Sequence, residues 1–416
     1  MSITEILYLS ATILTCAAAF GWANLMWFRL PHAIAMLLYA LVLSAVAIGL
    51  DHVTGGSVTE VLRAHIERIS FDKTLMIGML SFLLFAGALH VDLAVLLSRK
   101  WPVFLMATLG VFISTFIVGY AAFYALGFMG MPIALPWCLV FGALISPTDP
   151  VAVMSMLKKV KLPEVLETAI AGESLFNDGM GVVVFTLMLY LAVPGSEATG
   201  WSASAGLFLR EVVGGLFLGF IAGWFVTCAM RKIDDYNIEV LITLALVTGL
   251  YSLCLSLHMS GPLAVVVAGL VMGNHGTKIA MSDKTRKYMQ MFWSLIDEIL
   301  NSVLFLLIGF QVLVFDFSMG MMAAIAVIVP VVLVARFISV AASIKLLPRR
   351  HYLGRGAIPI LTWAGLRGGI SVALALSLPS FPGRETILIM TYGIVVFSII
   401  LQGMTVQTLA RRYEEK

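Results

Sequence analysis

Two charged stretches interrupt long apolar segments near the middle of the chain: Ser146-Pro147-Thr148-Asp149-Pro150 and Gly172-Glu173-Ser174-Leu175-Phe176-Asn177-Asp178-Gly179. They place three carboxylates in two neighbouring hydrophobic segments. A single charge at the centre of a membrane-spanning helix costs at least about 2.5 to 3.5 kcal/mol. Since such a charge is usually retained for a function, the two stretches indicate an ion site at membrane depth.

The composition places the chain among polytopic membrane proteins. Apolar residues make up 61% of it and charged residues 12%, and its mean hydropathy is +1.02. A soluble domain contains about 25% charged residues, and a helix needs about 20 consecutive apolar residues to cross a bilayer. The chain has many such runs with short connections between them, so we expect an all-α polytopic membrane protein with no soluble domain.

The apolar runs predict thirteen transmembrane helices, with boundaries good to a few residues. They lie at about 6–28, 30–50, 74–97, 102–128, 133–157, 165–193, 206–229, 238–257, 261–275, 292–315, 319–346, 355–378 and 386–410.

The basic residues predict the orientation of these helices. If all thirteen cross, 19 of the 26 lysines and arginines fall on one side, and three lie at or within spans. The other side receives only Arg63, Arg68, Lys73 and Arg384. Because basic loops stay in the cytoplasm, we expect a multi-pass protein of the cell (inner) membrane. Its N-terminus would lie outside and its C-terminus in the cytoplasm.

Two of the predicted spans are interrupted. Pro147 and Pro150 flank Thr148 and Asp149, and each proline removes a backbone donor and disfavours helix at the preceding residue. The twelfth span contains the second interruption, Gly365-Leu366-Arg367-Gly368-Gly369. If spans 1 to 6 and 8 to 13 are related halves, both breaks fall in the fifth member. The odd offset predicts two inverted repeats with broken helices crossing at mid-membrane, a plan found in secondary transporters.

The residue types in the two stretches suit a cation. On a helix, Ser174 and Asp178 lie four residues apart and share a face. Thr148 adds a carbonyl or hydroxyl oxygen from the interrupted segment, and Asp149 adds a second carboxylate. Oxygen ligands favour hard cations, and burial favours the protonated form of a carboxyl group. A cation and a proton would therefore compete for the same oxygens.

Two arginines in apolar segments call for counter-charges. Arg367 lies in the second interruption, so an ion pair with Glu173 is a better interpretation of Glu173 than direct ligation of a cation. Arg336 is interpreted as a buried counter-charge or a helix-end partner, without an identified mate.

A further polar group stands near the predicted start of the tenth span. Asp297, Glu298 and Asn301 are interpreted as a polar helix start near the membrane surface rather than as a second site. His90, at the end of the third span, is interpreted in the same way.

These motifs resemble a known family. The run from Thr148 to Phe185, with its TDP break and GESLFND segment, resembles the paired fifth and sixth helices of the monovalent cation:proton antiporters. The branch is that of the bacterial NhaP-type sodium/proton antiporters and the animal sodium/proton exchangers. An LRGGIS-like segment begins at Leu366. Some relatives carry a Glu in the third span, whereas Leu84-Phe85-Ala86-Gly87 stands here.

The resemblance implies roles for individual residues. It makes Thr148, Asp149, Ser174 and Asp178 the cation and proton ligands, with Na+ held at Asp149, Ser174 and Asp178. Asn177 is the Asn of the family's Asn-Asp pair. Glu173 and Arg367 match its buried ion pair.

The resemblance also implies a homodimer in which an ion-carrying core moves against a dimerisation domain. The core would comprise residues 102–193 and 319–410, and the dimerisation helices residues 6–97 and 238–315. Residues 206–229 would link the two. The expected partners are Na+, with Li+ or K+ as alternatives, H+ and the lipid bilayer, and neither a cofactor nor a nucleic acid is expected.

The sequence leaves three functions to compare. The first is an antiporter that exchanges cytoplasmic Na+ for external H+ by alternating access, electroneutrally at 1:1 because Asn177 cannot titrate. The second is a passive cation or proton channel. The third is an intramembrane hydrolase with Asp149 and Asp178 as a dyad, which the absence of HExxH and GxSxG patterns disfavours. No phosphate-binding loop is present, so ATP-driven transport is disfavoured as well.

Overall fold

The computed structural model describes residues 3–54, 63, 66, 71–149, 153, 154, 157, 163–193, 201–276, 281–347, 353, 354 and 356–413. Every regular element in this part of the chain is a helix. Ten of these helices are long and apolar enough to cross a membrane. The expectation of an all-α polytopic fold is confirmed.

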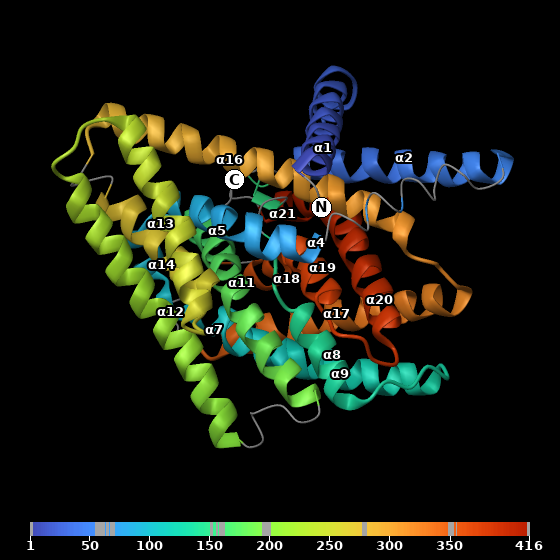
Figure 1. The fold of residues 1–416 in the computed structure, drawn as a ribbon. Helices are drawn as coiled ribbons and strands as arrows, with labels where there is room; N and C mark the ends of the chain where they lie inside the picture. The colour runs from blue at the N-terminus through green and yellow to red at the C-terminus, as the bar shows by residue number, and fades with distance from the viewer. Residues whose placement is uncertain are drawn as a thin grey trace.

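The helices are labelled in Figure 1. Their bounds are α1 Ile3–Ala23, η1 Asn24–Phe28, α2 His32–Thr54, α4 Phe71–Lys73, η2 Thr74–Met79, α5 Leu80–Leu89, α6 Leu93–Ser98, α7 Lys100–Ala107, α8 Leu109–Phe128, α9 Leu135–Leu144, α11 Glu164–Ala192, α12 Trp201–Met230, α13 Tyr236–Ser256, α14 Gly261–Val271, η3 Met272–Gly276, α16 Asp283–Phe310, η4 Gln311–Val314, α17 Met319–Lys345, α18 Ala357–Trp363, α19 Gly369–Leu376, α20 Arg384–Phe397, η6 Ser398–Gln402 and α21 Gly403–Arg411.

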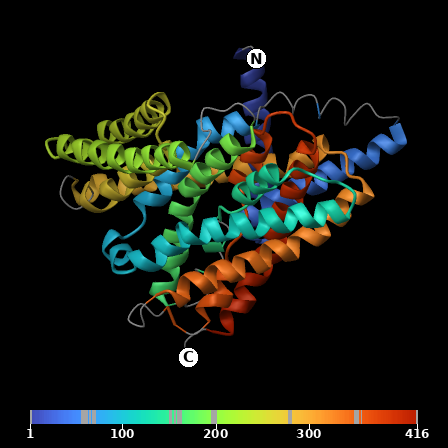
Figure 2. The same cartoon turned by 90° about the horizontal axis from the view of Figure 1, so that it is seen from below.

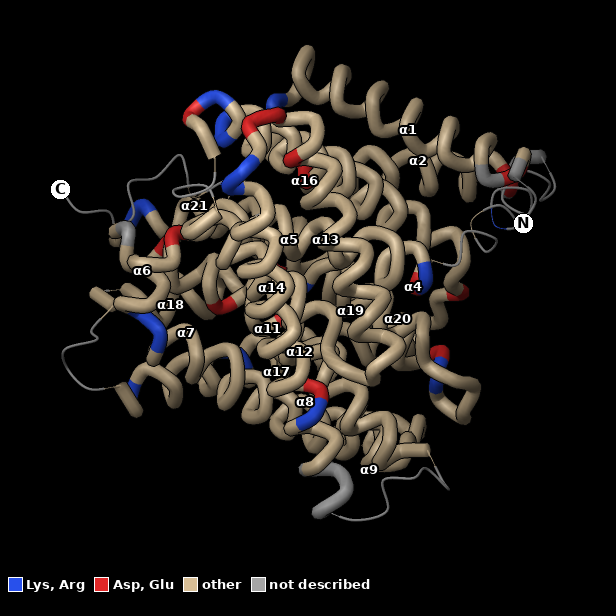
Figure 3. The backbone as a smooth tube through the Cα atoms, turned by 60° about the vertical axis from the view of Figure 1, so that its left-hand side comes forward, with Lys and Arg blue, Asp and Glu red and all other residues tan. Residues whose placement is uncertain are grey.

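Ten of the thirteen expected spans correspond to long helices, some of them continued by a π-helical turn. The fifth and twelfth are interrupted and leave the short helices α9, α18 and α19, and the ninth is the short pair α14 and η3. Figure 3 shows that most of the backbone carries uncharged residues, with the lysines, arginines, aspartates and glutamates gathered at a few places along it.

The helices pack in two groups. In one, α8 packs against α9 and α17, α11 against α9 and α7, and α17 against α20. In the other, α16 packs against α2 and α5, and α14 packs against α5 and α13. Figure 2 shows the yellow-green helices gathered at one side of the molecule and the teal and orange helices at the other.

Helix α12 joins the second group through three glycines spaced four residues apart. A Cβ atom on any of them would crowd the backbone of α14: the glycines are Gly215, Gly219 and Gly223, and they face Ser260, Ala264 and Ala268. Small residues at this spacing let two helices approach closely where lipid removes the hydrophobic drive for association. The residues expected to form a linking helix are therefore tightly bound to α14.

Helix α1 is the least buried of the long helices. Only 6% of its most apolar window is buried inside the protein, and Figure 1 shows it standing out from the body. Its exposed side chains include Leu7, Tyr8 and Leu14. A single chain thus leaves an apolar helix almost wholly for lipid or another protein to cover.

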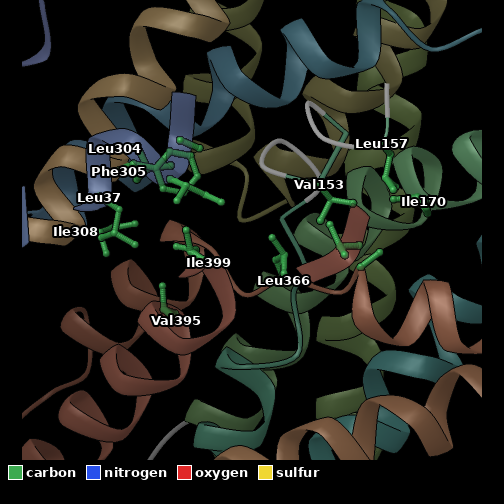
Figure 4. Close-up of a cluster of buried hydrophobic side chains, with 14 of the residues drawn as sticks. Leu37, Val153, Leu157, Ile170, Leu304, Phe305, Ile308, Leu366, Val395 and Ile399 are labelled. Atoms are coloured by element: carbon green, nitrogen blue, oxygen red, sulfur yellow. The ribbon is translucent and has the colours of Figure 1, made fainter. Parts of the chain in front are cut away.

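The break of the twelfth span is anchored in a hydrophobic cluster. Leu366 is fully buried within it, together with Leu304 and Ile308 of α16 and Ile399 of η6. Figure 4 shows Leu366 between these side chains on one side and those of Val153, Leu157 and Ile170 on the other. Arg367, the next residue, is consequently held at a fixed depth inside the protein.

Candidate ion-binding site between the broken helices

The two interrupted segments meet inside the protein. Helix α9 ends at Leu144 and leaves residues 145–149 without helical structure, and residues 364–368 separate α18 from α19 in the same way. The backbone N–H of Asp149 donates to the carbonyl oxygen of Leu366, at 2.8 Å. Both interruptions predicted from proline and glycine are therefore present, and they are hydrogen-bonded to each other.

Arg367 satisfies the open end of α9. Its Nη1 donates to the carbonyl oxygens of Ser146, at 2.5 Å, and Pro147, at 3.0 Å. Carbonyls just beyond the C-terminus of a helix lack intrahelical partners and carry partial negative charge. Its own backbone N–H donates to Ser398 Oγ, at 2.8 Å. A buried cation thus stabilises the end of α9, which comes just before Pro147.

The ion pair of Glu173 is formed with Arg336 of α17, so its predicted pairing with Arg367 is wrong. Both terminal nitrogens of Arg336 bind the carboxylate, and the distance from Nη2 to Oε2 is 2.8 Å. Arg336 Nη2 also donates to the carbonyl oxygen of Leu361 in the last turn of α18, at 3.1 Å. Each arginine therefore donates to carbonyl oxygens at the C-terminal end of one broken helix, Arg367 at α9 and Arg336 at α18. Because Arg367 is engaged at α9, Arg336 is the arginine that pairs with Glu173.

Asp149 lies against the start of α19. Gly368 has extended backbone, and a Cβ atom at this position would collide with the Asp149 carboxylate. The glycine therefore leaves the space that the carboxylate occupies. The N-terminus of a helix carries partial positive charge and favours a nearby anion.

A chain of polar side chains joins the first break to α11. Thr148 Oγ1 and Ser174 Oγ are hydrogen-bonded at 3.0 Å, and Asn177 Nδ2 donates to Thr148 Oγ1 at 3.2 Å. All three residues are buried. Ser174 and Asp178 lie one turn apart on α11, as the sequence predicted. The amide of Asn177 is thus engaged in holding the interrupted segment.

A cavity of about 700 Å³ reaches this region. Thr148, Asp149 and Asp178 line it together, with Gly368 from the second break. None of the described residues that line it is a lysine or an arginine. A space lined by carboxylate and hydroxyl oxygens, without a basic group, suits a cation.

The cavity also contains acidic residues that the sequence analysis assigned to a helix start. Asp297, Glu298 and Asn301 of α16 line it, and Asn301 Nδ2 donates to Asp297 Oδ1 at 3.0 Å. That assignment is wrong, because α16 begins fourteen residues earlier, at Asp283. The sequence signal for this helix start is Ser282, the N-cap residue, whose side chain accepts a hydrogen bond from the backbone N–H of Thr285.

His90 also lines the cavity, rather than only ending its helix. Its ring nitrogens lie 2.7 Å from the carbonyl oxygen of Ala86 and 3.0 Å from Ser294 Oγ of α16. His32 lines the cavity as well and is hydrogen-bonded to Ser302 Oγ at 2.6 Å. In the third span Leu84, Ala86 and Gly87 face the cavity, so α5 contributes no carboxylate to its described lining.

Broken helices that meet at their interruptions, with carboxylates facing a cavity between them, define a membrane transporter of the broken-helix class. Residues 7–412 match the family described as "Sodium/hydrogen exchanger, transmembrane". The chain belongs to this family. Since the family consists of transporters, the intramembrane hydrolase is set aside.

Two relatives match over nearly the whole chain. The Na(+)/H(+) antiporter NhaP of Pseudomonas aeruginosa is 48% identical over 409 residues, which cover 97% of this chain and 96% of that protein. The Na(+)/H(+) antiporter NhaH of Halobacillus dabanensis is 34% identical, with 92% of each chain covered. The fold resembles that of the sodium proton antiporter MjNhaP1 from Methanocaldococcus jannaschii at pH 8. Its TM-score is 0.78 at 18% identity, over 100% of this chain and 99% of that one.

Proposed function

We propose that the protein is a Na+/H+ antiporter that exchanges cytoplasmic Na+ for external H+ by alternating access. The observation that carries the proposal is the shared cavity, where Asp149 and Asp178 meet at the crossing of two broken helices. Thr148, Asp149, Ser174 and Asp178 would hold the cation. The carboxyl group of Asp178 would bind either the cation or a proton.

The buried charges support a 1:1 electroneutral exchange. The Glu173 and Arg336 pair has no net charge, which leaves Arg367, Asp149 and Asp178. These three sum to zero when Asp178 is protonated, and again when Asp178 is ionised beside a monovalent cation. The core thus has the same net charge with either occupant, and a buried site favours neutrality because isolated charges are costly there.

Two histidines that line the cavity, His32 and His90, support a conformation in which the cavity opens to the cytoplasm. His32 follows Arg29 at the start of α2, and His90 precedes Arg99 and Lys100. The positive-inside rule assigns these basic segments to the cytoplasm. In this orientation the N-terminus lies outside the cell membrane, the C-terminus lies in the cytoplasm, and Na+ enters the cavity from the cytoplasm.

The packing supports a division into a moving core and a fixed scaffold. The proposed core, about 102–193 and 319–410, holds the breaks and both arginines. The proposed scaffold, about 6–97 and 238–315, includes α1, whose exposed apolar surface suits the interface of a homodimer. The contacts of Gly215, Gly219 and Gly223 with α14 attach α12 to the proposed scaffold.

Transport in liposomes tests the proposal. The purified protein is reconstituted with an internal pH dye, and Na+, Li+ or K+ is added outside in turn. We expect a pH change that needs an alkali cation and that Na+ elicits, with no net proton flux when the cation is absent. Proton flux that continues without any counter-ion would identify a passive channel and overturn the antiporter.

A further inference from the structure

Ser371 occupies an unexplained position in the second broken helix. It is the third residue of α19 and is 1% exposed. It is one of the residues that line the cavity, together with Asp149 and Asp178. Its Oγ has no hydrogen-bond partner among the residues that the structure describes.

A buried serine hydroxyl without a partner is unusual in a helix. Serine in a helix commonly donates to a carbonyl three or four residues earlier, and Ser377 in this same segment does so, to Leu374, at 2.8 Å. For Ser371 the corresponding carbonyls belong to Arg367 and Gly368, which lie in the break. Buried polar groups are nearly always satisfied, so the Ser371 hydroxyl needs a partner from the cavity.

We propose that Ser371 Oγ is an additional ligand of the transported alkali cation. This inference rests on the proposed antiport. It gives the C-terminal half a direct part in cation binding, beside Asp149 from the first break and Asp178 from α11. Helix α19 therefore contributes an oxygen from the last residue of the LRGGIS-like segment, a residue to which the sequence analysis assigns no role.

The chemistry of a hydroxyl separates this role from that of the carboxylates. A neutral oxygen can replace one water of a dehydrated alkali cation, but it does not take up the exchanged proton. Its removal should weaken cation binding and leave proton binding unchanged. Losing one such contact corresponds to a rise of about three- to tenfold in the half-saturating Na+ concentration.

Four variants in proteoliposomes test the assignment. Ser371→Ala and Ser371→Cys remove the hard oxygen, Ser371→Thr keeps a hydroxyl, and Ser377→Ala removes a similar hydroxyl that does not line the cavity. The half-saturating Na+ concentration is measured across a pH series. Binding is also followed without transport, as the rise in melting temperature that Na+ causes in detergent.

We expect Ser371→Ala and Ser371→Cys to raise the half-saturating Na+ concentration by the same factor at every pH, while the maximal transport rate stays unchanged. The rise in melting temperature that Na+ causes should be smaller in both variants. The pH midpoint of proton competition should stay in place, because Asp178 is intact. Ser371→Thr and Ser377→Ala should resemble the unaltered protein.

Two results would overturn the assignment. One is an unchanged half-saturation in both Ser371→Ala and Ser371→Cys. The other is a shift of the pH midpoint along with half-saturation, since this would make Ser371 a structural support of Asp178. A failure of the antiport proposal is distinguishable, because the unaltered protein would then lack cation-dependent proton flux.

Discussion

Asp178 is the residue on which the proposed exchange depends most directly. Replacing it by Asn keeps the shape of the side chain and removes the charge and the exchangeable proton. We expect Asp178→Asn to abolish Na+-driven proton flux in liposomes while the protein still folds and melts cooperatively in detergent. Asp51→Asn, near the end of α2 and outside the cavity lining, is the control and should transport normally. Normal flux in Asp178→Asn would remove Asp178 from the site.

The pair of Glu173 and Arg336 should matter for stability. Arg336→Ala leaves a buried carboxylate without its cation, which typically destabilises by about 3 to 5 kcal/mol. It also leaves the Leu361 carbonyl without a donor. Combining it with Glu173→Gln should recover part of the loss, measured as melting temperature in detergent. Strict additivity of the two changes would contradict the coupling.

The sequence identified the charged residues of the core but not all of their partners. Asp149 and Asp178 are predictable because carboxylates are conspicuous in apolar segments, and Ser174 because it lies four residues before Asp178 on a helix. The structure brings Asp149 and Asp178 to one cavity. Glu173 was given the wrong arginine, because two buried arginines are equivalent until the helix ends that need donors are known. Ser371, the last residue of the LRGGIS-like segment, receives no role from the sequence because an uncharged serine gives no charge signal.

At the scale of the element, α16 shows how a boundary changes an interpretation. The sequence predicted a span from about 292, which placed Asp297 and Glu298 at the membrane surface. The helix in fact starts at Asp283, and both residues line the cavity. By contrast, the breaks in the fifth and twelfth spans were predictable, because proline and glycine act on the local backbone alone.

The acidic residues of α16 should attract cations to the cavity. Glu298→Gln removes a negative charge and should raise the half-saturating Na+ concentration modestly, by about twofold at low ionic strength. The effect should fade as an impermeant salt screens the charge. Glu385→Gln, an exposed carboxylate in the first turn of α20 and outside the cavity lining, is the matched control. Equal effects of the two changes would show a general surface effect rather than local attraction.

At the scale of the whole molecule, the orientation in the membrane can be tested by labelling. In a background without native cysteines, Lys284→Cys, at the start of α16, should react with a membrane-impermeant thiol reagent only after the membrane is opened. Glu385→Cys, at the start of α20, should react from outside. The reverse pattern would invert the orientation derived from the basic residues.

The charge balance of the core predicts that transport is independent of the membrane potential. Liposomes are clamped with K+ and valinomycin at several potentials, after K+ has been excluded as a substrate. The Na+ gradient that just stops proton flux is then measured. We expect this null point to stay fixed, because one proton is exchanged for one monovalent cation. A shift with voltage would mean that a second group exchanges protons.

Under the proposed 1:1 exchange, the amide of Asn177, which is hydrogen-bonded to Thr148 and cannot titrate, would set a limit on what the protein can do for a cell. With one exchangeable charge per cycle, the exchange comes to rest when the inside-to-outside ratio of Na+ equals that of H+. In a medium more acidic than the cytoplasm, the protein expels Na+. In an alkaline medium with equal Na+ on both sides, the same 1:1 exchange would run backwards and bring Na+ in, so a cell growing there would need a different pump to remove salt.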